Sequence, residues 1–459
     1  MIGNTMKEII YAIFLSFFLC GLCGNAEAKK KKEVKKAIKR EVQTPYDKLF
    51  KGNGLMKMHL MAGKVYAEFP IELLNRDLAL TSSIEDISDN GEGVVGQFAG
   101  RVNQFRFTLQ DSMLQARLVR RYGVKNTGMG KNADQIIERS NTPGIFQSYK
   151  ILAYTPDKKA VVVDMTELFL ESSRLTNPFP SYAGNSLYGF VQRIHKFQSQ
   201  RSELLGICGN DNSMSVRCNL GFNVDRLVLG SFMQAKDVPV SVTVNKILML
   251  LPEDPMRPRL ADSRIGVNAI IQTELPDVCQ GIKTYYITKR WRIEPVDEIR
   301  YKQGEMVDVK KPIVFYIDTL MPDSWIKYVK AGAEAWNAAF EKIGLRNVVR
   351  TELFPKDSSF DAGDIHNSVI RYAPSWMYYP QYSMHTDPRT GEILNASVYL
   401  PANVASYFYT SRTEETMAVD PSVRKARLSE EQFGEMFKAK MMQAIGRCLG
   451  LTDNYAASS

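Results

Sequence analysis

Histidine and cysteine side chains are the groups in this sequence best suited to bind a metal or to act as nucleophiles. The four histidines are His59, His195, His366 and His385. No two of them have the spacing of ligands on one helix or one hairpin, so we expect each to be a surface or hydrogen-bonded core side chain. His385 is the strongest ligand candidate, because it comes just before a turn sequence that begins at Asp387.

The cysteines are sparse and show no metal-site spacing. Two lie near the N-terminus, and the other four are Cys208, Cys218, Cys279 and Cys448. Cys208 and Cys218 flank a turn sequence at 209–212, which leaves a hairpin disulfide and two free thiols as equal alternatives. Cys448 lies in a helical pattern with no histidine near it in sequence, and a thiol without a basic partner is a poor nucleophile.

The elements that must position such groups differ between the two parts of the chain. Up to about residue 300, short runs of alternating apolar and polar residues are separated by turn sequences, which predicts a mainly β structure. The clearest runs cover residues 64–69, 78–82, 104–109, 116–119, 160–164 and 240–244, with turn clusters at 88–93 and 177–185.

Near Pro312 the pattern changes to strands that alternate with helices. Strands are expected over 312–317, 348–354, 368–372 and 393–400. After the first of them, Asp323 is expected to cap a helix whose apolar stripe runs from Trp325 to Ile343 in steps of three or four residues.

A second long helix is expected after Ser429. Gln432, three residues further on, gives the signature of a capping box. The buried stripe should run from Phe433 to Cys448, and Gly450 should end the helix.

Several phrases of the sequence resemble those of large secreted bacterial zinc-dependent metalloproteases, which are metzincin-like and carry N-terminal domains of unknown function. These phrases are FPIELLNRD at 69–77, RWRIE at 290–294, PIVFYID at 312–318, WNAAFEK at 336–342, DPRTGEIL at 387–394 and QAIGRCLGLTDNYAASS at 443–459. The likeness extends over about residues 45–459. It implies an α+β fold, in which β-rich N-terminal domains precede the N-terminal half of a metzincin-like catalytic domain, a mixed sheet with two long helices.

The resemblance also implies a domain organisation. The expected parts are a signal peptide at 1–28, a basic linker at 29–45, a small β domain of unknown function at 46–88, a β-rich domain of unknown function at 89–300 and a truncated metzincin-like domain at 305–459.

The chain departs from the family at the catalytic motif. In the family, the last helix carries His-Glu-x-x-His, and a third histidine follows the glycine that ends the helix. Matched position by position, Gln443 replaces the first zinc ligand, Ala444 the catalytic glutamate, Arg447 the second ligand and Asp453 the third. Arginine cannot lose its proton to bind zinc, and alanine cannot serve as a base. We therefore expect no zinc, no other cofactor and no peptidase activity.

The sequence also stops soon after this helix, where the family continues into a second subdomain that completes the cleft. We therefore expect that restoring the three histidines and the glutamate would not recover peptidase activity. Two alternatives remain open. The chain could be an active metallopeptidase that recruits substitute ligands such as Asp453 or His385, or it could be the product of a truncated or decayed protease gene.

The resemblance places a substrate-binding strand at residues 393–400, at a sheet edge over the cleft. Such an edge can pair with an extended peptide through backbone hydrogen bonds and needs no metal. The implicated residues are Asp387, Arg389, Gly391, Ile393, Asn395 and Ser397. This favours a non-catalytic protein that binds a peptide or a protein partner.

The replaced ligands could interact with each other. Gln443 and Arg447 are neighbours on one helix face, and in the family the turn after the glycine brings the third ligand back to that face. We therefore predict an ion pair between Arg447 and Asp453, with Gln443 hydrogen-bonded to one of them. The alternative is that Asp453 extends into solvent, because chain ends fray.

Charge and the N-terminal sequence bound the remaining possibilities. The net charge is +9, but residues 29–42 hold eight basic and two acidic residues and so account for +6 of it. We therefore expect no nucleic-acid partner.

The N-terminus has the form of a secretory signal, with Lys7, the apolar run 9–22 and the small residues Ala26 and Ala28 in the usual order. This predicts a secreted or periplasmic protein. We expect no transmembrane segment, because that run is shorter than the roughly 20 residues needed to span a bilayer.

Overall fold

The computed structural model describes residues 54–119, 124–126, 131–172, 175, 177–179, 191–229, 232–275, 283–356, 360–375, 379–425 and 427–454. The described residues lie in one compact unit. The expected signal peptide and basic linker fall outside them, as do Cys279 and most of the turn cluster at 177–185. The fold is strand-rich α+β, as expected. No helix in the described part of the chain is long and apolar enough to cross a membrane.

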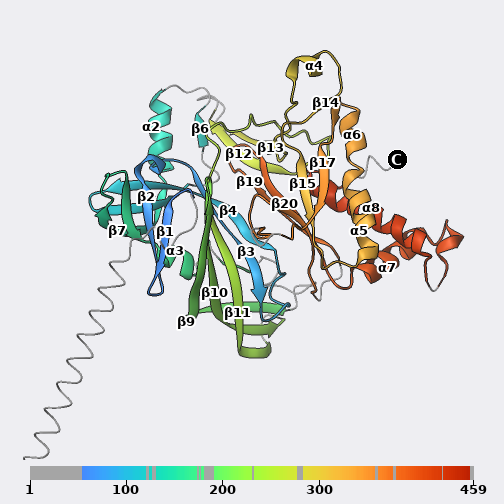
Figure 1. The fold of residues 1–459 in the computed structure, drawn as a ribbon, viewed down its shortest axis with the longest axis horizontal. Helices are drawn as coiled ribbons and strands as arrows, with labels where there is room; N and C mark the ends of the chain where they lie inside the picture. The colour runs from blue at the N-terminus through green and yellow to red at the C-terminus, as the bar shows by residue number, and fades with distance from the viewer. Residues whose placement is uncertain are drawn as a thin grey trace, which may run out of the picture. The chain divides into compact units, whose positions relative to one another are not determined.

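A ten-stranded antiparallel sheet forms the first part of the fold (Figure 1). Its order is β1-β2-β8-β7-β5-β4-β3-β11-β10-β9. The strands are β1 (Lys57–Met61), β2 (Lys64–Pro70), β3 (Leu78–Ile87), β4 (Phe98–Gln110), β5 (Met113–Leu118), β7 (Gly144–Tyr154), β8 (Ala160–Asp164), β9 (Val191–Asn210), β10 (Ser213–Val228) and β11 (Phe232–Leu250). Every strand expected from the alternating runs is present. The boundary expected between residues 88 and 89 falls between strands of this one sheet.

Smaller elements accompany the large sheet. A three-stranded sheet has the order β13-β12-β6, and a two-stranded sheet pairs β14 with β16. Their strands are β6 (Val124–Asn126), β12 (Ala269–Leu275), β13 (Lys283–Thr288), β14 (Val307–Asp308) and β16 (Leu345–Arg346). The short helices are η2 (Ile71–Leu73), α2 (Lys131–Ser140), α3 (Thr166–Leu170) and α4 (Glu298–Lys302).

A five-stranded mixed sheet forms the C-terminal part, with the order β17-β15-β18-β20-β19. The strands are β15 (Ile313–Ile317), β17 (Val349–Leu353), β18 (Ser368–Tyr372), β19 (Gln381–Thr386) and β20 (Ile393–Leu400). The helices are α5 (Asp323–Glu334), α6 (Asn337–Glu341), α7 (Val404–Thr416), η4 (Pro421–Val423) and α8 (Glu430–Cys448). All pairs are parallel except β19 with β20. The four expected strands are confirmed, whereas β19 and α7 were not anticipated.

The first long helix differs from its prediction in three ways. It ends at Glu334 and continues only as the separate short helix α6, because Asn337 bonds with its side chain to both the backbone N and the backbone O of Val349. The capping position belongs to Pro322, and Asp323 is the first helical residue. Ile343, expected in the buried stripe, is 56% exposed.

Helix α8 agrees closely with the sequence. The Ser429 hydroxyl accepts from the Gln432 backbone N–H, and the Gln432 side chain accepts from the Ser429 N–H, which completes the capping box. Gly450 ends the helix with a φ of +98°. Phe437, Met441 and other apolar side chains of α8 pack with α5 on one face of the five-stranded sheet, and Figure 1 shows both helices on that side.

The expected alternatives for the cysteines are resolved in favour of free thiols. Cys208 and Cys218 are both unpaired. The β9–β10 hairpin forms as expected, but its register places Cys208 opposite Ser215 and Cys218 opposite Leu204. The two sulfurs therefore do not face each other across the hairpin.

Asp361 joins the loop before β18 to the large sheet. It accepts hydrogen bonds from the Gly363 amide at 2.7 Å and from the Asn245 side chain on β11 at 3.2 Å. Burial raises the pKa of this carboxyl, and the neighbouring Asp364 raises it further, although the Gly363 amide and two arginines act in the opposite direction.

The substitution Asp361→Asn is therefore expected to stabilise the protein near neutral pH. An acid whose pKa is higher in the folded state binds more protons there, so stability is lost as the pH rises from about 3.8 through the raised pKa. The asparagine side chain carries no charge to bury, and Asn245 can turn its amide oxygen toward the new amide. Urea unfolding should give a larger free energy of unfolding for the variant near pH 7, and this gain should shrink toward pH 4. A gain that is independent of pH would contradict this account.

Candidate functional site

The exposed face of α8 forms the floor of a pocket of about 230 Å³. Lys440, Gln443, Ala444 and Arg447 lie on this face because they are three, four and seven residues apart. The walls come from the start of β19 and from α7, and they are lined by Tyr379, Pro380, Gln381, Tyr382, Tyr407, Phe408 and Glu415. We call this the α8 pocket. It brings together three of the four positions at which the resembling family has its zinc ligands and catalytic glutamate.

Arg447 is the central charged group of the α8 pocket. Its Nη2 donates to both carboxylate oxygens of Asp453, at 3.2 and 3.1 Å, which confirms the predicted ion pair. Its guanidinium also lies over the ring of Tyr382, 5.6 Å from the centroid. The side chains of Arg447 and Asp453 are 34% and 51% exposed, so the pair adds little stability.

Gln443 does not make the expected hydrogen bond. It is exposed to solvent, and the described part of the chain shows no bond from it to Arg447 or to Asp453. The Arg447 guanidinium contacts the Asp453 carboxylate through Nη2 and lies over the Tyr382 ring instead.

The second cation of the pocket floor is also held by a carboxylate. Lys440 Nζ lies 3.1 Å from Glu415 Oε1 on α7. The Ser411 hydroxyl and Lys440 lower the pKa of Glu415, so this carboxyl is ionised at neutral pH. Of the charged side chains that line the pocket, two are therefore positive and one is negative.

Neither the floor nor its surroundings offers a metal site or a nucleophile in the described residues. No cluster of three or more histidine, cysteine, aspartate or glutamate side chains could hold a metal there or elsewhere in the described part of the chain. Cys448 is fully buried on the opposite side of α8, and burial raises its pKa to about 12. A thiol in that state does not attack substrates.

The edge strands of the five-stranded sheet are β17 and β19, and this corrects the prediction for residues 393–400. Strand β20 pairs with β18 on one side and with β19 on the other. A strand paired on both sides has no free backbone groups for a peptide. Tyr382 of β19 contacts Arg447, so the beginning of this edge strand runs beside the α8 pocket, whereas its end, at His385 and Thr386, is buried against Phe98 of β4.

Ile393, Asn395 and Ser397, expected to bind substrate, are buried. Ile393 lies in the core under α8. Asn395 and Ser397 point to the opposite face of the sheet, because the register shift between His385 and Thr386 leaves an extra residue after Ile393 and breaks the regular alternation of the strand. Asn395 donates to the backbone oxygens of Ile365 and Asn367, and Ser397 accepts from the backbone N–H of Val369. Asn395 therefore fixes the loop before β18 to β20, and Ser397 joins β20 to β18 itself.

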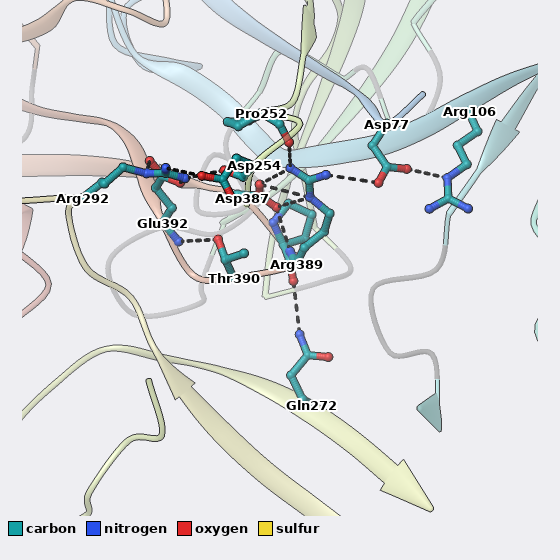
Figure 2. Close-up of polar contacts among 11 residues, drawn as sticks. Asp77, Arg106, Pro252, Asp254, Gln272, Arg292, Asp387, Arg389, Thr390 and Glu392 are labelled. Carbon is teal, nitrogen blue, oxygen red and sulfur yellow. Dashed lines mark hydrogen bonds and ion pairs between the residues drawn. The ribbon is translucent and has the colours of Figure 1, made fainter. Parts of the chain in front are cut away.

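Asp387 and Arg389, also expected at the substrate strand, instead join the C-terminal part to the large sheet (Figure 2). Arg389 donates to its neighbour Asp387 through Nε at 3.0 Å and through Nη2 at 2.7 Å. Its Nη1 reaches Asp77 Oδ2 at 3.3 Å and its Nη2 reaches the backbone oxygen of Pro252 at 2.9 Å. Asp77 in turn pairs with Arg106 on β4 at 2.5 Å. This group of residues is the Arg389 anchor.

Gly391 and its neighbour complete the same turn. Gly391 has a φ of +76°, and a Cβ there would lie 2.5 Å from the backbone oxygen of Thr288, so the turn requires glycine. Glu392 accepts two hydrogen bonds of 2.9 Å from Arg292, also visible in Figure 2. The turn with the sequence DPRTGE is thus a largely buried contact between the C-terminal part and the rest of the fold, and it does not line the α8 pocket.

The histidines have the structural roles that their spacing predicted. His59, His195 and His366 each bond to a carboxylate, on Glu68, Glu92 and Asp364 respectively. His385 is buried on β19, with its ring centroid 4.8 Å from that of Phe98.

A larger cavity of about 950 Å³ lies apart from the α8 pocket, between η2, the end of β11 and the segment around Arg292. Three ion pairs lie along its walls. Arg76 lies 2.5 Å from Glu253, Arg292 bonds to Glu392, and Lys310 lies 3.3 Å from Glu294.

Sequence reasoning did not identify the aromatic wall of the α8 pocket. Tyr379 and Tyr407 face each other with ring centroids 6.3 Å apart, and Tyr382 is 43% exposed. The spacing of tyrosines in the WMYYPQY phrase at 376–382 was the available signal, since exposed aromatic residues beside a proline are unusual in a buried strand.

Comparison with known proteins bears on the β-rich part of the chain. Residues 96–296 match the model of a family described as a domain of unknown function, DUF5117. The match overlaps the domain expected at 89–300 and lies before the α8 pocket. No curated protein matches the chain, and no solved structure does. The similarity to this family is therefore confined to the β-rich part of the chain.

Proposed function

We propose that this chain is an exported, non-catalytic relative of the metzincin-like zinc metalloproteases, and that it binds an extended peptide or protein segment. The segment would add to the edge of β19 at residues 381–384, which are not buried, with side chains entering the α8 pocket. The observation that carries the proposal is the position of this edge beside the pocket. Backbone hydrogen bonds supply affinity in such complexes, and pockets for alternate side chains supply specificity.

The proposal that the chain does not hydrolyse peptides is supported by the residues that form the floor of the pocket. Arg447 places a permanent positive charge where the resembling family holds zinc, and Ala444 has no group that could accept a proton. Hydrolysis of a peptide needs a base or a metal-bound water, and neither side chain provides one.

The purified protein is expected to hold far less than one equivalent of zinc. The matched variant Gln443→His with Arg447→His should bind about one, because two imidazoles four residues apart on one helix face would stand beside the Asp453 carboxylate. Zinc content after dialysis, measured by atomic absorption, tests both expectations. Stoichiometric zinc in the native protein, together with peptide cleavage that a chelator abolishes, would overturn the proposal.

Binding at the β19 edge is expected to slow amide hydrogen exchange in residues 381–384, the part of the strand that is not buried against β4. Pairing with a peptide converts exposed backbone N–H groups into hydrogen-bonded ones, and exchange then requires their opening. The probe is a capped, uncharged peptide of about eight residues, the length of an ordinary strand. Protection confined to other strands, or no protection at saturating peptide, would rule out this edge as the site.

A further inference from the structure

We propose that the α8 pocket selects peptides with an aspartate or glutamate side chain, which would bind at Arg447. This inference rests on the proposed function and adds the chemistry of the ligand to it. Three features of the pocket support it. They are the charged side chains of its floor, the N–H groups of Arg447 that make no hydrogen bond, and the ion pair that Arg447 already forms with Asp453.

The floor of the pocket carries two cations. Lys440 lies beside Glu415 of the lining, and Arg447 pairs with Asp453, which lies outside the lining and is half exposed. Glu415 already lies 3.1 Å from Lys440 and also bonds to Ser411. The carboxylate that lines the pocket is therefore committed to Lys440, which leaves Arg447 as the cation that faces an incoming peptide.

Several N–H groups of the Arg447 guanidinium are not used in hydrogen bonds within the described part of the chain. A guanidinium carries five N–H groups, and Asp453 takes only those of Nη2. In the described part of the chain, Nε and Nη1 of Arg447 make no hydrogen bond. The Tyr382 ring holds the plane of the guanidinium beside β19. A peptide paired with β19 would thus place one side chain next to a fixed, partly unsatisfied cation.

Asp453 shows that this position accepts a carboxylate. Both of its oxygens lie 3.1 to 3.2 Å from Nη2, although its own side chain is half exposed. An exposed pair of this kind contributes little to stability, so a ligand carboxylate can replace it. Asp453 is then an internal competitor for the acidic side chain of the peptide.

The test uses three fluorescent peptides of about eight residues with capped ends, identical except for Asp, Asn or Lys at one central position. Fluorescence anisotropy with the full chain is expected to show at least about fivefold tighter binding of the Asp peptide than of the Asn peptide, and the weakest binding for Lys. The Arg447→Gln variant should lose this preference while it still binds the Asn peptide.

The Asp453→Asn variant separates the inference from a general charge effect. It removes the competitor and should tighten binding of the Asp peptide by up to about fivefold, with little change for the Asn peptide. Arg264→Gln, at a fully exposed arginine outside the pocket, is the control and should change neither.

The outcomes are distinguishable. Equal affinity for the three peptides overturns the acidic preference and leaves the proposed function standing. Failure of all three to bind overturns the proposed function and the preference with it. An Asp preference that survives in Arg447→Gln, with melting curves showing that the variant is folded, assigns the anion to another group and overturns the role of Arg447.

Discussion

Replacing Asp387 with alanine is expected to lower the free energy of unfolding by about 3 to 5 kcal/mol, because the substitution leaves a largely buried arginine without its main carboxylate. Asp387 is 0% exposed and the Arg389 side chain is 23% exposed. Asp77 and the Pro252 oxygen would remain as partners of Arg389, but each contacts only one guanidinium nitrogen. Urea unfolding followed by far-ultraviolet circular dichroism measures the loss.

The chain contains its own control for this prediction. Asp262 and Arg264 have the same spacing and the same local bonds as Asp387 and Arg389, with Arg264 Nε 3.0 Å from Asp262 Oδ1 and Nη2 2.6 Å from Oδ2. Here, however, the arginine is 87% exposed. Asp262→Ala should leave the unfolding midpoint unchanged. If the two substitutions had equal effects, burial would not be the cause, and the Arg389 anchor would have no special role in joining the two parts.

Local patterns predicted the parts of the fold that depend on neighbours in sequence. The bounds of β18 and β20, the capping box of α8 and the Arg447–Asp453 pair were all expected. In each case the determining contacts lie within one strand, one helical turn or one glycine-ended turn. Hydrophobic periodicity and capping signals report such contacts directly.

The features that the sequence did not predict depend on contacts between residues far apart in the chain or on the register of paired strands. The apolar stripe continues past Glu334 without interruption, yet Asn337 binds the backbone of Val349 and separates α6 from α5. Nothing within the helix signals this partner, which belongs to the next large strand. The same holds for the cysteines, because hairpin register, and not distance along the chain, decides which residues face each other.

The helix that carries Gln443, Ala444 and Arg447 was predicted correctly, whereas the edge of the sheet was predicted on the wrong strand. Residues 393–400 form a nearly continuous buried run, which is typical of an interior strand. By contrast, the QYSMHT sequence of β19 mixes polar and apolar residues, as edge strands do, since one side of the strand meets solvent. Asp387 and Arg389 could not be assigned from sequence, because their partners Asp77 and Pro252 lie more than a hundred residues away.

The α8 floor depends on an unusually close contact between α8 and α5. Gly332 of α5 faces the backbone of α8, where an added Cβ would lie 2.7 Å from the Lys438 oxygen and 2.7 Å from the Met441 Cβ. On α8, Gly446 packs against the ring of Trp336, which also donates to the backbone oxygen of Met442. The glycines let the two helices approach, and this approach sets the position of the pocket floor relative to β19.

Gly332→Ala is therefore expected to destabilise the protein by about 1 to 3 kcal/mol, the usual cost of overpacking a core, even though alanine favours a helix by about 1 kcal/mol over glycine. The clash involves a backbone oxygen, so rotation of a side chain cannot relieve it and the helices must separate. Gly206→Ala on β9 is the matched control, because a Cβ there meets nothing within 4 Å. Thermal unfolding should show a clear loss for the first variant and none for the second. A stabilised Gly332→Ala protein would show that helix propensity outweighs the contact, and that the pocket floor does not depend on the close approach of the two helices.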